Sequence, residues 1–380
     1  MNTFKNPMLL CLILTHFACQ SSIKNVTTVL MDDTQMVVCD ENAVTEKKEI
    51  KLSQLVEDFQ IIRLDNRDEA LFKWRWLFFS ENYICVRQDD RPIKLFDKTG
   101  TFISNVGDIG QGPGEYTAVY DIIIEEKSKT IYVSPIAGKD ILKYDITGKF
   151  LGKIELVERL NKPRLSMQND SVLSLVHLCF KDRGNKFTAA NVHVHDRDSL
   201  IYLYSEELAS NFVNKKGSGS GYNNEIWSYR NVPEFAFMMT YKDTLFQYDS
   251  EANKIKARFT LKMDDKKKGD SFFIFTELPN HYLARIIGEN GRSILVDKEK
   301  NEAYECSFVN DFMGNMSVNP SFQDGYNFAI YEPLVLKEMI EEHLASGNCP
   351  EEQVEKLSSL KESLKENDNN VLFLGKLKKE

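Results

Sequence analysis

The segment of residues 107–116, GDIGQGPGEY, combines residue types that can bind a ligand. Gln111, Glu115 and Tyr116 carry an amide, a carboxylate and a phenol, and the glycines around them allow tight backbone turns. The segment superficially resembles a phosphate-cradling loop. It lacks the Lys-Ser/Thr pair of a P-loop, however, and the strand-like YDIIIEE follows it where a P-loop has a helix. We therefore expect either a structural connection or a loop that presents Gln111, Glu115 and Tyr116 to a ligand.

The tryptophans are candidates for apolar contacts to a ligand. Trp227, in GYNNEIWSY, follows the glycine-rich segment NKKGSGSG. A long segment of this kind runs over the protein surface, so Trp227 is a candidate ligand contact. Trp74 and Trp76, in KWRWLFF, would share one face of a strand. The pair can pack in a core or form a platform for a sugar.

Metal and nucleophile chemistry have little support in the sequence. His193 and His195 would share a strand face and could hold a metal, but an ordinary polar strand face is the favoured interpretation, since no further His or Cys ligand is close in sequence. GxSxG, HExxH, EF-hand and paired-carboxylate motifs are absent, and none of the seven cysteines forms a CxxC pair. Cys85 and Cys179 lie in apolar segments and are expected to be small buried hydrophobes. No catalytic residue is predicted.

The charge pattern limits the partners. The formal net charge is −9, and no basic stripe is present. A mildly acidic surface repels phosphate backbones, so we expect no nucleic-acid partner.

The first residues form an export signal. Lys5 precedes the apolar run of residues 7–14, PMLLCLIL, which is too short to span a bilayer. The following HFAC resembles a bacterial lipobox, with Cys19 as the lipidated residue. We expect a signal peptide over 1–18 and a lipid-anchored linker over 19–50; simple secretion and an uncleaved anchor are the alternatives. QSSIKN after Cys19 has no acidic cluster that would indicate surface display, which favours the periplasmic side of the outer membrane.

These residues must be positioned by a repeating strand–turn–strand unit. Apolar strands end at an aspartate, turn, and restart at five places with spacings of 48, 51, 53 and 48 residues: Asp97, Asp145, Asp196, Asp249 and Asp297. In each turn the aspartate accepts backbone hydrogen bonds, and Gly or Asn tolerates positive φ. About fifty residues hold four short strands, which is one blade of a β-propeller. A single blade cannot bury both of its faces, so the blades must close into a ring.

The chain ends supply a composite blade. The segments 59–65 (FQIIRLD), 326–333 (YNFAIYEP) and 371–377 (VLFLGKL) are strands outside the five repeats, and pairing them would remove the free sheet edge. This predicts an all-β, six-bladed β-propeller over 51–380, with seven blades as the alternative. A helical insertion over 333–366 interrupts the last blade, since Pro333 suits a first helical position and residues 354–364 show helical spacing.

A resemblance to a known family rests on IIRLDNRDEALF, IKLFDKTGTFISNVGDIGQGPGEYTAVYDIII, ILKYDITGKFLGKI and ENDNNVLFLGKLKK. These segments resemble the six-bladed β-propeller lipoproteins of anaerobic gut bacteria, which are related in fold to TolB-type and NHL propellers. The resemblance covers about residues 45–380 and implies a cell-envelope protein without agreed catalytic residues. Asp170, Asp198 and Asp243 resemble O-glycosylation sites of exported proteins in these bacteria, or start turns before strands.

The expected function is a cell-envelope binding or scaffold module that recognises a glycan, a peptide or a partner protein through loops on one propeller face. Gln111, Glu115, Tyr116 and Trp227 are the candidate contacts, and the channel mouth is the default pocket. The alternative is a calcium-dependent hydrolase or lactonase in the central channel, where several carboxylate or amide oxygens would converge at about 2.3–2.6 Å from a common point. A third possibility is a structural partner of an outer-membrane complex. No cofactor is expected for a binding module, whereas the hydrolase or lactonase would need calcium.

Overall fold

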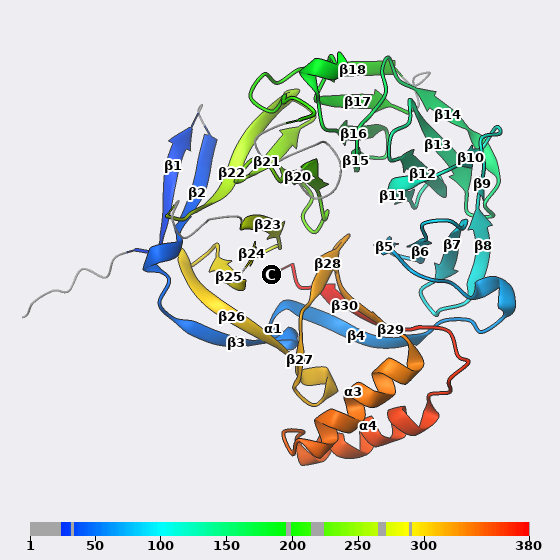
Figure 1. The fold of residues 1–380 in the computed structure, drawn as a ribbon, viewed down its shortest axis with the longest axis vertical. Helices are drawn as coiled ribbons and strands as arrows, with labels where there is room; N and C mark the ends of the chain where they lie inside the picture. The colour runs from blue at the N-terminus through cyan, green and yellow to red at the C-terminus, as the bar shows by residue number, and fades with distance from the viewer. Residues whose placement is uncertain are drawn as a thin grey trace, which may run out of the picture.

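The structure is a computed structural model, and it describes residues 24–31, 34–194, 199–213, 224–264, 271–288 and 291–379. Six sheets, each with four antiparallel strands as its blade, are arranged around a central axis, and β5, β11, β15, β23 and β28 lie nearest that axis (Figure 1). The predicted six-bladed, all-β propeller is confirmed.

Blades 1 to 3 are each built from four consecutive strands. Blade 1 contains β5 (Trp76–Phe79), β6 (Tyr83–Arg87), β7 (Ile93–Asp97) and β8 (Phe102–Val106). Blade 2 contains β11 (Val119–Glu125), β12 (Thr130–Pro135), β13 (Asp140–Asp145) and β14 (Phe150–Glu155). Blade 3 contains β15 (Arg164–Asn169), β16 (Val172–Val176), β17 (Ala189–His193) and β18 (Ser199–Leu203).

Blades 4 and 5 follow the same plan, and blade 6 joins the two ends of the chain. Blade 4 contains β19 (Ile226–Trp227), β20 (Phe235–Met239), β21 (Thr244–Asp249) and β22 (Lys254–Lys262). Blade 5 contains β23 (Phe272–Glu277), β24 (His281–Ile287), β25 (Arg292–Asp297) and β26 (Glu302–Asn310), extended by β27 (Met316–Val318). Blade 6 contains β28 (Ser321–Gln323), β29 (Tyr326–Tyr331), β30 (Val371–Leu377) and β4 (Val56–Arg63).

The ring closes where the first and last long strands pair. β4 and β30 run antiparallel, with Ile62 opposite Leu372, and β30 pairs with β29 on its other side. Leu372 is fully buried in the cluster between blades 6 and 1. The two ends of the chain are therefore hydrogen-bonded within one sheet, which confirms the composite blade predicted from the sequence.

The repeated aspartates mark equivalent turns. Asp97 Oδ1 accepts hydrogen bonds from the backbone N–H groups of Thr99 at 2.8 Å and Thr101 at 3.0 Å, and Gly100 has a φ of +92°. Asp145, Asp249 and Asp297 likewise accept backbone hydrogen bonds in the third-to-fourth-strand turns of blades 2, 4 and 5. Asp196, the repeat aspartate of blade 3, lies outside the described residues.

Apolar contacts between neighbouring sheets form the core. The rings of Phe79 in blade 1 and Phe328 in blade 6 lie 5.2 Å apart, and those of Phe259 in blade 4 and Phe275 in blade 5 lie 5.1 Å apart. Burying each such side chain stabilises the fold by about 1.5–3 kcal/mol. Each blade therefore buries both faces only through its neighbours, as a closed ring requires.

The predicted linker over 19–50 is partly a folded extension of the propeller. β1 (Val26–Met31) and β2 (Thr34–Asp40) form a hairpin, and β2 pairs in parallel with β22. β3 (Lys47–Lys51) pairs in parallel with β26, and the short helix α1 (Leu52–Leu55) follows. The polar composition suggested a tether, but the β-branched residues of this segment add strands to the outer edges of blades 4 and 5.

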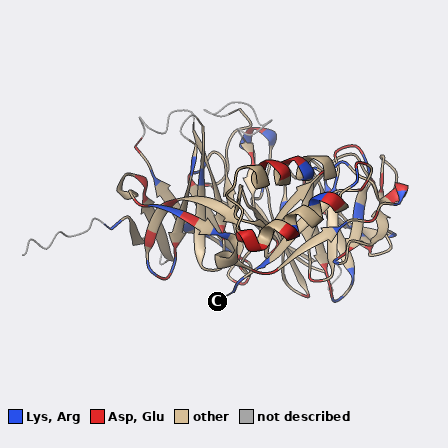
Figure 2. Cartoon of the chain, turned by 90° about the horizontal axis from the view of Figure 1, so that it is seen from below, with Lys and Arg blue, Asp and Glu red and all other residues tan. Residues whose placement is uncertain are grey.

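The helical insertion lies at the rim of the disc. α3 (Pro333–Ala345) and α4 (Glu351–Ser363) connect β29 to β30 and pack on blade 6 through Leu336, Ile340 and Leu357. Figure 2 shows the disc from its side, with acidic and basic residues scattered over the surface. Within the part of the chain that the structure describes, the helices are too short or too polar to span a membrane.

Candidate functional site

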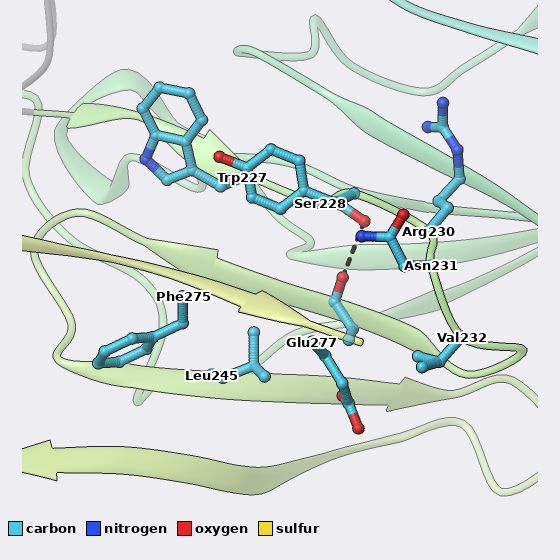
Figure 3. Close-up of a pocket in the computed structure, with 10 residues that line it drawn as sticks. Trp227, Ser228, Arg230, Asn231, Val232, Leu245, Phe275 and Glu277 are labelled. Carbon is cyan, nitrogen blue, oxygen red and sulfur yellow. Dashed lines mark hydrogen bonds between the residues drawn. The ribbon is translucent and has the colours of Figure 1, made fainter. Parts of the chain in front are cut away.

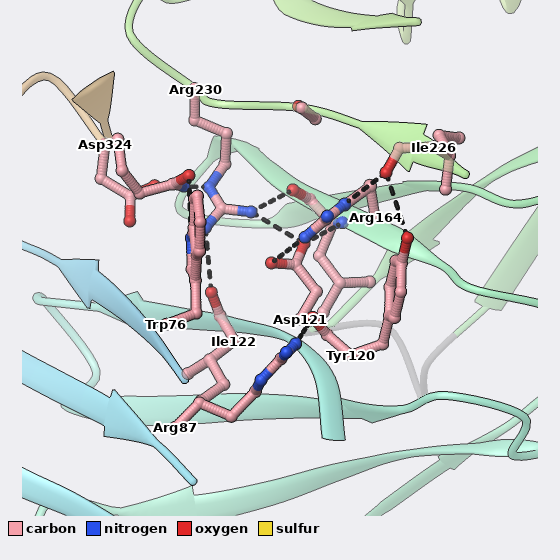
Figure 4. A network of polar contacts seen from close by, with 12 residues as sticks. Trp76, Arg87, Tyr120, Asp121, Ile122, Arg164, Ile226, Arg230 and Asp324 are labelled. Carbon is pink, nitrogen blue, oxygen red and sulfur yellow. Dashed lines mark hydrogen bonds and ion pairs between the residues drawn. The ribbon is translucent and has the colours of Figure 1, made fainter. Parts of the chain in front are cut away.

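Arg230 lies at the centre of a buried polar network on the axis (Figure 4). It belongs to the turn between β19 and β20 and has a φ of +51°, an uncommon conformation for a residue with a side chain. Its Nη1 donates to Asp121 Oδ2 at 2.8 Å, and its Nε donates to Asp324 Oδ1 at 2.6 Å. Arg230 of blade 4 thus links blades 2 and 6 across the axis. Arg230, Asp121, Asp324 and Arg164 are called the axial ion network below.

Asp121 is placed on the axis by an irregularity in its strand. The pairing of β11 with β12 shifts register between Val119 and Asp121, which indicates a β-bulge. The Asp121 side chain is fully buried and accepts a hydrogen bond from Leu165 N at 2.7 Å. Arg164 Nη1 lies 3.6 Å from Asp121 Oδ1, so two guanidinium groups surround this carboxylate.

Asp324 is placed on the axis by a tight turn. Asp324 and Gly325 form the two-residue connection between β28 and β29, and they have positive φ values of +54° and +80°. This is the Asp-Gly turn favoured in two-residue β-hairpins. The carboxylate accepts from Phe79 N at 2.9 Å and from Gln323 Nε2 at 3.0 Å, and Trp76 Nε1 donates to Gln323 Oε1 at 3.4 Å.

The axial ion network is electrostatically satisfied. Burial alone would lower the pKa of Arg230, but the charges of Asp121 and Asp324 outweigh burial and raise it, so Arg230 stays a cation. Burial raises the pKa of Asp324, and Arg230 opposes that rise. The axial ion network fills the centre of the ring at this level, and both of its carboxylates are already paired with the guanidinium of Arg230.

A hollow of about 350 Å³ opens beside this network. The hollow lies on the face of the disc that carries the turns between the first and second strands of the blades. The turns of blades 1, 4, 5 and 6 and the C-terminal strand form its walls. Figure 1 marks the C-terminus beside the axis. We call this space the axial hollow. It is lined by Ser80, Glu81, Asn231, Pro279, Asp324, Gly325, Tyr326, Lys376, Leu377 and Lys379.

Hydrogen bonds between distant segments fix the wall of the axial hollow. Gly325 N donates to Asn231 Oδ1 at 3.1 Å, and Leu377 N donates to Gly325 O at 2.9 Å. Asp324 N donates to Tyr229 O at 2.7 Å. The turns of blades 4 and 6 and the C-terminal strand are therefore held in one arrangement without a ligand.

Lys98 lies behind the aromatic wall of the axial hollow. Its Nζ is 3.6 Å from the centre of the Tyr326 ring and 5.2 Å from that of Phe79, within the range of cation–π contacts. Burial lowers the pKa of Lys98 to about 8, while Asp324 and Glu126 act in the opposite direction. The Lys98 cation is therefore partly desolvated behind the Tyr326 ring.

A second, more open groove of about 420 Å³ runs along blade 5. Arg285 and Arg292 contribute to its lining, but Arg285 bonds to the carbonyl of Pro320, and Arg292 pairs with Glu41 and Glu305. Its cations are thus engaged within the protein.

The structure places Gln111, Glu115 and Tyr116 away from the axial hollow. They lie in the connection between blades 1 and 2, where β9 (Asp108–Ile109) and β10 (Glu115–Tyr116) pair at the outer edge of the disc (Figure 1). Gln111 is exposed, and Glu115 Oε2 accepts from Gly112 N at 2.8 Å. Tyr116 is buried and donates to Val106 O at 2.5 Å while accepting from Ile93 N at 2.8 Å. The Tyr116 hydroxyl thus fastens the connection between blades 1 and 2 to the strands of blade 1.

Trp227 is half-buried and packs against neighbouring side chains. Its ring is stacked with that of Tyr229 at 6.5 Å, and it packs against the cluster between blades 4 and 5. Figure 3 shows Trp227 with the residues around a small cavity, and Arg230 pointing away from it. This cavity measures about 10 Å³, the space of about one water molecule.

The other candidates fall in several places. Trp76 packs between blades 6 and 1, whereas Trp74 precedes β5 and is exposed. Cys85 and Cys179 are buried, as predicted, and are free thiols. His193 ends β17, and His195 and Asp198 lie outside the described residues, as does Cys19. Within the described ranges, no group of three or more His, Cys, Asp or Glu side chains could hold a metal ion.

Residues 35–376 match the family described as "Domain of unknown function (DUF4934)". The chain belongs to the DUF4934 family. This DUF4934 protein is similar in structure to a predicted exported protein of Bacteroides fragilis, with 16% sequence identity and a TM-score of 0.63, over 90% of this chain and 99% of the other. At this identity the likeness shows a shared fold.

Weaker structural matches extend the comparison. One is a member of the DUF4221 family from Bacteroides vulgatus, with 12% identity, a TM-score of 0.45, and coverage of 85% of this chain and 97% of the other. Another is virginiamycin B lyase from Staphylococcus aureus, with 10% identity, a TM-score of 0.41, and coverage of 84% and 99%. No curated protein matches this DUF4934 chain.

Proposed function

We propose that this DUF4934 protein is a binding module of the bacterial cell envelope that holds a segment of a glycan, a peptide or a partner protein in the axial hollow. The observation that carries the proposal is the construction of that hollow. Turns from four blades and the C-terminal strand enclose about 350 Å³ above a closed, ion-paired floor. Pockets of this size bind small ligands or single residues of larger ones, and a wall that is fixed in advance lowers the entropic cost of binding.

The proposed location is the envelope, with a lipid on Cys19 as the anchor. Support comes from the predicted signal peptide and lipobox, from the resemblance to six-bladed propeller lipoproteins of the TolB and NHL type, and from the exported protein of Bacteroides fragilis that shares the fold. The periplasmic side of the outer membrane is favoured because no acidic cluster follows Cys19.

A binding role is preferred to calcium-dependent hydrolysis because of the charges at the axis. Calcium requires several carboxylate or carbonyl oxygens around one point. The axial carboxylates, Asp121 and Asp324, instead surround the guanidinium of Arg230, and a second cation would be repelled there. A rise in melting temperature with calcium, lost in Asp324→Asn, would favour the hydrolase.

The test is ligand binding with and without a blocked hollow. Ser80→Trp places a large ring at the wall of the hollow, and Ser171→Trp places the same ring in the corresponding turn of blade 3, which does not line it. The purified full chain and both variants are screened against immobilised oligosaccharides and peptides, with circular dichroism as the folding control. We expect hits that Ser80→Trp weakens at least tenfold and Ser171→Trp leaves unchanged. Hits that bind both variants equally, or an absence of hits, would overturn the proposal.

A further inference from the structure

We propose that the axial hollow recognises a carboxylate group of its ligand; this rests on the proposed function and names the chemistry of the same site. The argument uses the charges that line the hollow, the unpaired hydrogen-bond donors in its wall, and its size.

The charged side chains of the lining are mainly cationic once internal pairs are counted. Asp324 is paired with Arg230, which leaves Glu81, Lys376 and Lys379. Lys376 and Lys379 are exposed and have no ion-pair partner among the described residues. Among the lining side chains that are not paired within the protein, two lysines therefore stand against one glutamate. Such a patch attracts anions and raises their local concentration.

Asn231 supplies a hydrogen-bond donor that is fixed in direction. Its side chain is 7% exposed, and its Oδ1 accepts from Gly325 N at 3.1 Å. This bond decides which end of the amide is oxygen, so the NH₂ group is the free end. The Nδ2 atom is buried without a hydrogen-bond partner in the described part of the chain, and Asn231 lines both the axial hollow and the small cavity beside Trp227. A buried donor of this kind costs free energy until an acceptor reaches it.

One more unpaired polar group, the Ser80 hydroxyl, lines the hollow, and another, the Lys98 ammonium, lies behind the Tyr326 ring outside the lining. The hydroxyl of Ser80 and the ammonium of Lys98 are buried without hydrogen-bond partners among the residues that the structure describes. Ser80 lines the hollow, and Lys98 contacts the Tyr326 ring that also lines it. An oxyanion satisfies several donors at once and forms charge-assisted hydrogen bonds, whereas a neutral hydroxyl satisfies fewer and more weakly. The donors of the lining itself, on Asn231, Ser80, Lys376 and Lys379, therefore favour a carboxylate.

The size of the hollow limits the ligand to about one acidic sugar or the last two residues of a peptide, because pockets enclose most of a ligand's surface. Both sources present a carboxylate on a small polar body. The site chemistry is the same for the two, and binding measurements can distinguish them.

The experiment uses matched acidic and neutral probes on the full chain. Glucuronate is compared with glucose, and N-acetyl-Ala-Ala with its C-terminal amide, by isothermal titration calorimetry at low and moderate salt. At least one acid should bind tenfold or more tightly than its neutral partner, with an affinity that falls as salt is added. Which acid binds identifies the source of the carboxylate.

Variants then test the site. Lys376→Gln removes an exposed lining charge, and Asn231→Asp keeps the acceptor for Gly325 N while replacing the free donor. Each should weaken the acid at least tenfold, whereas Lys149→Gln, an exposed lysine in a turn of blade 2 that does not line the hollow, should not.

The outcomes separate this inference from the proposed function. A ligand that Ser80→Trp blocks, but that binds equally well as acid and as neutral analogue, overturns the carboxylate inference and leaves the binding function intact. Acid binding that Lys376→Gln weakens and Ser80→Trp also abolishes supports both. Acid binding that none of the lining variants changes overturns both.

Discussion

Arg230 and Asp324 meet on the propeller axis at 2.6 Å, although 94 residues separate them in the chain. Each residue has a positive φ, and each belongs to a first-to-second-strand turn, of blade 4 and blade 6. An unfavourable backbone conformation persists where the surrounding contacts over-determine it. The ion pair between Arg230 and Asp324 thus holds the turns of blades 4 and 6 together at the axis, where they form the floor of the axial hollow.

Replacing Arg230 with Met should lower the free energy of unfolding by about 3–5 kcal/mol, because it leaves two buried carboxylates without their cation. Urea denaturation followed by tryptophan fluorescence would measure the loss. Lys127→Met is the control, since Lys127 also pairs between blades, with Asp170, but at the exposed surface, where little change is expected. Equal effects of the two variants would contradict the role given to the axial ion network.

His177 should make the protein less stable in mild acid. Its ring is fully buried, with Nε2 at 2.9 Å from Phe187 O and 3.7 Å from Glu158 Oε1, and burial lowers its pKa to about 4 from an unfolded value of about 6.5. Between these values the unfolded chain binds the extra proton. The stability contributed by neutral His177 is therefore complete above pH 6.5 and falls as the pH drops towards 4, by up to about 3 kcal/mol.

Unfolding free energies of the wild type and His177→Gln, measured from pH 7 to pH 4, would test this. Acidic side chains also contribute to the slope, so the difference between the two proteins is the relevant quantity. The variant should show the shallower decline. Parallel curves would refute the assignment to His177.

Tyr116→Phe should reduce stability without affecting ligand binding. The change removes the hydroxyl that bonds Val106 O and Ile93 N in a buried site, with an expected cost of about 1–3 kcal/mol. Gln111→Ala, at an exposed position in the same connection, should change neither property. If either substitution weakened a ligand that Ser80→Trp also blocks, the connection between blades 1 and 2 would have to be part of the binding surface.

Cys19→Ser should release the protein from the membrane fraction. A diacylglycerol on Cys19 would insert hydrocarbon chains into the bilayer, and a serine cannot be modified in this way. Incorporation of an alkyne-labelled fatty acid into the wild type, and its loss in the variant, would be the direct measurement. Labelling that persists in Cys19→Ser would place the lipid elsewhere.

The fold was predictable because its signals are local and repeated. Asp97, Asp145, Asp249 and Asp297 each build a turn from bonds within four residues, so the same short pattern reports the same structure each time. The pairing of residues 59–65 with 371–377 followed from the need to close the ring.

The site was less predictable because its residues meet across blades. Asp121 and Arg230 are 109 residues apart, and a bulge rather than a motif turns Asp121 inwards. The Asp-Gly pair at 324–325 was the one local signal, since it predicts a two-residue turn, but the turn does not reveal what its side chain contacts. Tyr116 shows the reverse problem: its glycine-rich surroundings suggest a binding loop, while its hydroxyl bonds inwards.

The N-terminal hairpin has a consequence for how the molecule would stand on a bilayer. Asn25 is tied to blade 5 through two hydrogen bonds with Ala303, so a lipid on Cys19 would be six residues from a fixed point on the rim. Six residues reach at most about 20 Å. The outer side of the disc at blade 5, where Asn25 is held by Ala303, would then stay close to the membrane surface.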